Sequence, residues 1–145
     1  ASALHDVGKI AIPDSILLKP GRLTKEEFEY MKEHTTKGCE IINNIRGVWS
    51  EEYAKASYEI CRHHHERYDG RGYPDGLLGE NISAQLVAVA DVYDALVNER
   101  VYKSAFSADK AFNMIINGEC GTFSPKLMDC FTKCRDRFES LAGEQ

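Results

Sequence analysis

The segment 82–96 constrains the fold more than any other part of this 145-residue chain. Its large apolar residues recur at helical spacing, at Ile82, Leu86, Val89, Tyr93 and Leu96. Most of the intervening positions are apolar too, so the predicted helix is hydrophobic almost all round. Such a helix must be covered by other elements on nearly every side, and we therefore expect it at the centre of the fold.

Short polar caps predict the starts of the other helices and, with them, an all-α fold. Thr24 and Glu27 have the spacing of a capping box, which opens a helix that ends at Gly47 and is interrupted near His34. The apolar positions of this helix are Phe28, Met31, Ile41, Ile42 and Ile45. Further caps are predicted at Ser50, Ser107 and Ser124. Residues 68–80 are too rich in glycine to be regular, and no segment shows the period-two alternation of a hairpin.

The composition fits a single domain, which we assign to residues 1–145. A net charge of −5 argues against binding to a nucleic-acid polymer or an anionic membrane. No apolar run of about 18 residues and no secretory leader is visible, so we expect a cytoplasmic protein without a membrane span. The chain opens at Ala1 without Met, and residues 1–7 are predicted to be the tail of a helix whose beginning is missing.

Two pairs of adjacent residues are candidate metal ligands. His64 and His65 end a run of three histidines. Neighbouring residues on a helix point about 100° apart, so each ring can bind a different one of two ions. His5 and Asp6 have the same adjacency, and the carboxylate of Asp6 can bridge two ions. The alternative for the histidines is a solvated surface run, with His63 pointing elsewhere.

Asp91 and His34 are further candidates. Asp91 lies in the apolar 82–96 helix, where an ionised carboxylate needs a cation or strong hydrogen bonds. Alternatively, Asp91 can cap a helix or pair with an arginine. The alternative for His34 is a structural or surface histidine. If these groups converge, two divalent ions would be neutralised by Asp6, Asp91, a bridging hydroxide and one phosphodiester. That charge balance favours a phosphodiesterase.

Four basic residues lie near these motifs: Lys9, Arg71, Arg100 and Lys103. Each, taken alone, can be a solvated surface charge. Arg100 and Lys103 follow the apolar helix three positions apart, so they can meet on one phosphate, with Arg as a bidentate donor and Lys as a point charge.

The order and spacing of several motifs, which cover nearly the whole chain, resemble one known family. They are His5-Asp6-x-Gly8-Lys9-Ile10, His34-x-x-x-Gly38, HHERYDGRGYP from His64 to Pro74, Ala90-Asp91-x-x-Asp94, and Arg100-x-Tyr102-Lys103. On these motifs the chain resembles the HD-GYP subgroup of the HD-domain metal-dependent phosphohydrolases. The resemblance implies an HD-domain-like helical bundle with a C-terminal helical extension and a GYP loop.

The resemblance also implies an activity, the hydrolysis of cyclic di-GMP to pGpG or GMP with two or three divalent ions, iron or manganese. Carried over by position, the metal ligands would be His5, Asp6, His34, His64, His65 and Asp91. Asp6 and Lys9 would act in catalysis, Asp6 as the bridge and Lys9 at the scissile phosphate. Substrate would meet Asp69, Gly72, Tyr73, Arg100 and Lys103.

Three departures from the family pattern stand beside the resemblance. The upstream helix that carries another histidine ligand is missing, the segment before Ala84 is about two residues short, and Gln85 stands where many relatives have arginine. Two alternatives therefore remain, namely a phosphohydrolase of another nucleotide or cyclic dinucleotide, and a non-catalytic binding module. Members are commonly fused to receiver or sensory domains, so we expect one in the parent protein, and a homodimer is compatible with the family.

Overall fold

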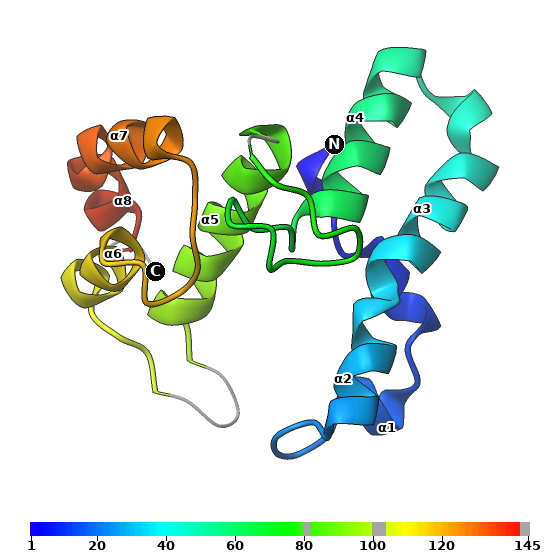
Figure 1. Cartoon of the computed structure of the whole chain (residues 1–145), viewed down its shortest axis with the longest axis horizontal. Helices are drawn as coiled ribbons and strands as arrows, with labels where there is room; N and C mark the ends of the chain where they lie inside the picture. The colour runs from blue at the N-terminus through cyan, green and yellow to red at the C-terminus, as the bar shows by residue number, and fades with distance from the viewer. Residues whose placement is uncertain (80–81, 100–103, 143–145) are drawn as a thin grey trace.

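The computed structural model describes residues 1–79, 82–99 and 104–142, and within these ranges the regular structure is helical (Figure 1). The α-helices are α1 (Asp14–Leu17), α2 (Lys25–Lys32), α3 (His34–Asn44), α4 (Glu51–His63), α5 (Ile82–Val97), α6 (Ala108–Ile116), α7 (Pro125–Lys133) and α8 (Arg135–Ala142). The 3₁₀ turns are η1 (Ser2–Leu4), η2 (Val7–Ala11) and η3 (Arg46–Val48). The prediction of an all-α fold is confirmed.

Helix α5 lies between the other helices, as its apolar sequence predicted (Figure 1). It packs against α4, and also against α6 and α7. Val89, Tyr93 and Leu96 are buried in a core shared with α6 and α7, where Phe112 and Phe131 stack at 4.3 Å between ring centroids. One part of α5 stays uncovered, since Leu86 is 51% exposed. Within the described ranges, no helix has the length and apolar character needed to cross a membrane.

A second, smaller core lies between α3 and α4, which run side by side (Figure 1). Its buried members are Cys39, Ile42 and Cys61. Leu4 and Val7 from the start of the chain pack against it, so the N-terminal segment is held on the α3–α4 pair. This contact brings the first metal-ligand candidates to the others.

The caps predicted from sequence are present. Thr24 and Glu27 form a reciprocal capping box at the start of α2, and the serine caps before α4, α6 and α7 each accept a backbone N–H. The interruption expected near His34 falls at Glu33, where α2 ends and α3 begins. Each capped helix therefore begins where its polar side chain can accept an otherwise unpaired amide.

The expected helix tail over residues 1–7 is wrong. Instead the chain forms the 3₁₀ turns η1 and η2, with Asp6 between them. Gly8 in η2 lies directly against α3, where a Cβ would be 1.9 Å from the carbonyl oxygen of His34.

Candidate metal centre and substrate cleft

Three separate segments converge to form the candidate metal centre. Asp6 lies between η1 and η2, His34 begins α3, and His64 and His65 directly follow α4. Two glycines permit this approach. Gly8 lies against the backbone of His34, and a Cβ on Gly38 would be 2.4 Å from the sulfur of Cys61. The motifs are therefore joined by close backbone packing of η2, α3 and α4.

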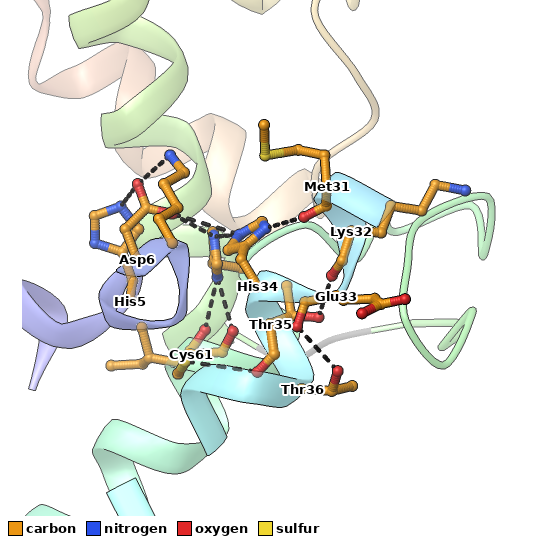
Figure 2. A network of polar contacts seen from close by, with 12 residues as sticks. His5, Asp6, Met31, Lys32, Glu33, His34, Thr35, Thr36 and Cys61 are labelled. Carbon is orange, nitrogen blue, oxygen red and sulfur yellow. Dashed lines mark hydrogen bonds and ion pairs between the residues drawn. The ribbon is translucent and has the colours of Figure 1, made fainter. Parts of the chain in front are cut away.

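The two carboxylate oxygens of Asp6 face different groups of nitrogen atoms (Figure 2). Oδ1 lies 3.4 Å from Nε2 of His34 and 3.7 Å from Nε2 of His64. Oδ2 lies 3.3 Å from Nε2 of His5 and 2.6 Å from the ammonium of Lys9. Oδ1 of Asp6 thus faces the imidazoles of His34 and His64, whereas Oδ2 faces the imidazole of His5 and the ammonium of Lys9.

Backbone carbonyls fix the orientation of three imidazoles. Nδ1 of His5 donates to the Ser2 carbonyl at 2.8 Å. Nδ1 of His34 donates to the Met31 carbonyl at 2.7 Å (Figure 2). Nδ1 of His64 donates to the Cys61 carbonyl at 3.0 Å. A carbonyl only accepts, so these nitrogens carry the protons and each neutral ring keeps its Nε2 lone pair. Metal-binding histidines are held in this way.

The chemistry of the cluster fits a divalent cation. One ligand atom each from Asp6, His34, His64 and His65 lies within 4.8 Å of the others. The Nε2 atoms of His34 and His64 are 3.3 Å apart, so their lone pairs face each other. Among the described residues, neither Asp6 Oδ1 nor His5 Nε2 has a hydrogen-bond partner, although both are buried. A cation between these atoms would satisfy them.

Burial and neighbouring charges set the protonation of the cluster. Burial alone would raise the pKa of Asp6, but the close imidazoles of His5 and His64 and the ammonium of Lys9 outweigh it and hold the pKa well below its usual range. Burial, with His64 and His34 close by, lowers the pKa of His65 to about 3. The cluster therefore offers an ionised carboxylate and a neutral imidazole at neutral pH, as metal ligands must be.

His5 and Asp91 border the four-residue cluster. His5 approaches Asp6, and its ring lies 5.0 Å from that of His64 between centroids. The Asp6 carboxylate raises the pKa of His5, and Asp91 adds to the effect from α5. Both His5 and Asp91 line a groove of about 720 Å³ along the uncovered part of α5. They are thus placed next to the cluster, on its α5 side.

A cleft of about 310 Å³ opens beside the cluster, and it is lined by both His64 and His65. Gly72 and Tyr73 from the predicted loop line it as well. The Tyr73 ring stacks on that of His65, with centroids 4.7 Å apart and planes 23° apart. Gly72 is required here because a Cβ would lie 2.4 Å from the amide nitrogen of Arg67.

Asp69 belongs to the same loop but is not among the residues that line the cleft. Its carboxylate accepts hydrogen bonds from Arg67, Arg71 and the Thr122 hydroxyl, and its pKa is lowered mainly by Arg67. This network ties the loop to the segment before α7. Arg100 and Lys103 lie outside the described residues.

The sequence alone did not identify three residues that shape the cleft, namely Glu66, Phe28 and Lys32. Glu66 is buried, and its carboxylate accepts the backbone N–H groups of Asp75, Gly76 and Leu77 at 2.6, 3.0 and 2.9 Å. Phe28 and Lys32, both on α2, line the cleft. The position of Glu66 directly before a glycine-rich loop was the available signal for its role, whereas Phe28 matched the pattern of a core residue.

A family model described as HD domain matches residues 1–127. The chain belongs to the HD domain family. This HD domain is 46% identical to a cyclic di-GMP phosphodiesterase of Vibrio cholerae, over 99% of the chain and 30% of the relative. It is 44% identical to the cyclic di-GMP phosphodiesterase response regulator RpfG of Xanthomonas campestris, over 99% of the chain and 38% of the relative.

A third relative is named for a different substrate. The HD domain is 40% identical to the 3'3'-cGAMP-specific phosphodiesterase 2 of Vibrio cholerae, over 97% of the chain and 27% of the relative. The chain therefore spans about a third of the length of the curated relatives it matches. The resemblance to the HD-GYP subgroup that the motifs suggested is confirmed by these matches.

Proposed function

We propose that this HD domain is the catalytic part of a metal-dependent phosphodiesterase that hydrolyses cyclic di-GMP to pGpG or GMP. The observation that carries the proposal is the convergence of Asp6, His34, His64 and His65 beside a cleft. Relatives named for this activity match nearly the whole chain. The cluster supplies the ligands, and the cleft supplies room for part of a nucleotide next to them.

Each side chain has a distinct part in the proposed reaction. Two or three divalent ions, iron or manganese, would activate a water and stabilise the charge that develops on phosphorus. Asp6 would bridge two of them, held in place by its contacts on both oxygens. Lys9, now paired with Asp6 at 2.6 Å, would contact the scissile phosphate. Tyr73 covers one face of His65 and excludes water there.

Other residues extend the proposed site. We include His5 and Asp91 as further ligands, because both border the cluster and share one groove. Arg100 and Lys103 would hold phosphate, and Asp69 would act by fixing the loop that carries Gly72 and Tyr73.

A different cyclic dinucleotide is the second candidate substrate. It is favoured by the relative named for 3'3'-cGAMP, which is 40% identical. A non-catalytic module that binds the dinucleotide would share the cleft but lack turnover. We further propose that a receiver or sensory domain is fused to the HD domain, because one relative is named a response regulator. A cytoplasmic location and a homodimer are also part of the proposal.

The test is hydrolysis of cyclic di-GMP, followed by chromatography, with anaerobic Fe(II) or with Mn(II), in the full-length protein. Asp6→Ala is expected to abolish turnover and to lower bound metal, because it removes the bridging carboxylate. Asp129→Ala is the control, since Asp129 is an exposed α7 residue paired with Lys133. Full turnover by Asp6→Ala would contradict the bridging role, and turnover of 3'3'-cGAMP alone would favour the second substrate.

A further inference from the structure

Helix α2 presents an exposed aromatic ring to the cleft. Phe28 is 45% exposed and lies edge-on to Tyr73, with ring centroids 6.1 Å apart. Tyr73 in turn stacks on His65 of the metal cluster. The aromatic side chains thus continue outward from the cluster, so a ligand that enters toward the metal passes Phe28 and then Tyr73.

Lys32 adds a positive charge to the same wall. It lies one turn after Phe28 on α2, and its ammonium is 5.1 Å from the Phe28 ring centre and 5.5 Å from that of Tyr73. Its ion-pair partner is Glu29 at 2.7 Å, and the Lys32 and Glu29 side chains are 27% and 69% exposed. Ion pairs that reach solvent in this way contribute little, so the ammonium can be transferred from Glu29 to a ligand at small cost.

Packing alone does not account for the position of Phe28. The sequence pattern placed Phe28 with the apolar residues of its helix, yet almost half of the side chain is in solvent. Tyr30, on the same helix, is similarly exposed at 37%, but it contacts Lys37 and lies outside the cleft. Phe28 and Lys32 therefore differ from their neighbours on α2 by facing the cleft together.

A purine base fits this pair of groups. An aromatic ring stacks on a base through its face, and a lysine ammonium donates to acceptors on the base edge. Guanine presents two acceptors, O6 and N7, on one edge, whereas adenine presents N7 beside an amino donor. A cationic donor at this position therefore favours guanine over adenine.

We propose that Phe28 and Lys32 form a guanine subsite of the cleft. One base of the dinucleotide stacks on Phe28, and Lys32 donates to O6 and N7 of that base. The cleft volume of about 310 Å³ is at the lower end for ligand sites, so it holds one nucleotide unit while the other extends beyond it. The inference rests on the proposed function and specifies which base the site prefers.

The test compares cyclic di-GMP with cyclic di-AMP in the full-length, metal-loaded protein. Lys32→Met is expected to lower the ratio of kcat/KM for the two substrates by about tenfold, because it removes the donor to O6 and N7. Lys37→Met on α3 is the matched control and should leave the ratio unchanged. A loss of fold would lower both rates together and would not move the ratio.

Phe28 is tested by its effect on binding. Phe28→Ala should raise KM for cyclic di-GMP by about tenfold with kcat and bound metal unchanged, and Phe28→Trp should restore KM, because stacking needs only an aromatic face. Tyr30→Ala is the control on the same helix. Binding of cyclic di-GMP is measured by calorimetry alongside turnover.

The outcomes separate the subsite from the function. If the wild-type protein binds and cleaves cyclic di-GMP while Lys32→Met keeps its guanine preference and Phe28→Ala keeps its KM, the subsite is wrong and the function stands. If the wild-type protein neither binds nor cleaves cyclic di-GMP, the proposed function is wrong and the subsite is lost with it.

Discussion

Single glycines determine whether the metal ligands can meet. Gly8 lies so close to α3 that a methyl group would overlap the His34 carbonyl, and Gly38 faces Gly8 and Cys61 in the same contact. Asp6 and His34 can therefore approach each other because Gly8 and Gly38 have no Cβ atom. At this scale, backbone approach matters more than the strength of any one hydrogen bond.

Gly8→Ala tests this contact. The new Cβ would meet backbone rather than a movable side chain, so we expect a loss of about 2–3 kcal/mol in the free energy of unfolding, typical of overpacking, together with weaker metal binding. Chemical denaturation and metal analysis measure both. Gly47→Ala is the control because a Cβ there meets nothing within 4 Å. Unchanged metal binding in a folded Gly8→Ala protein would show that the close contact is not needed.

The loop between α4 and α5 is organised around a buried carboxylate. Glu66 accepts three successive loop amides, and Arg62 holds Asp75 with two hydrogen bonds of 2.7 and 2.6 Å. His63 also contacts Asp75, at 3.1 Å. Although its described residues form no helix or strand beyond one isolated β-bridge, the loop is fixed at its centre, which keeps Tyr73 on His65.

Glu66→Ala should release this loop. Three amides lose their charged acceptor, so we expect a loss of about 2–4 kcal/mol in stability and faster tryptic cleavage at Arg71, whose side chain is 77% exposed. Glu52→Ala, at an exposed position of α4, is the control. If cleavage at Arg71 is no faster in the variant, the loop is held by other contacts.

At the scale of the whole molecule, the candidate ligands Asp6, His34, His64 and His65 come from the N-terminal segment and the ends of α3 and α4, which pack together. These segments are far apart in the sequence, and the unfolded chain cannot hold the four side chains together. Bound metal should therefore stabilise the fold as a whole, because a ligand that binds only the folded state shifts the unfolding equilibrium.

Metal removal measures this coupling. At a free-metal concentration of a hundred times Kd the stabilisation is about 2.7 kcal/mol, which corresponds to a rise in Tm of roughly 5–10 °C for a chain of this length. We expect EDTA to reverse the rise, and His34→Ala to abolish it. Equal Tm values with metal and with EDTA in the wild-type protein would contradict metal binding at the cluster.

The sequence by itself determined the helical fold, the caps and the central place of α5, and it named Asp6, His34, His64 and His65 as candidate ligands, which the tertiary structure brings together. The helices and caps follow from local signals, because the spacing of apolar residues and the chemistry of a cap act over a few residues. The candidate ligands follow from motifs whose order and spacing match those of a known family. The outward-facing position of Phe28 and the buried role of Glu66 were decided only by the tertiary structure. Both depend on contacts between distant segments, and the same apolar or acidic residue can face a core, a cleft or solvent according to what packs beside it.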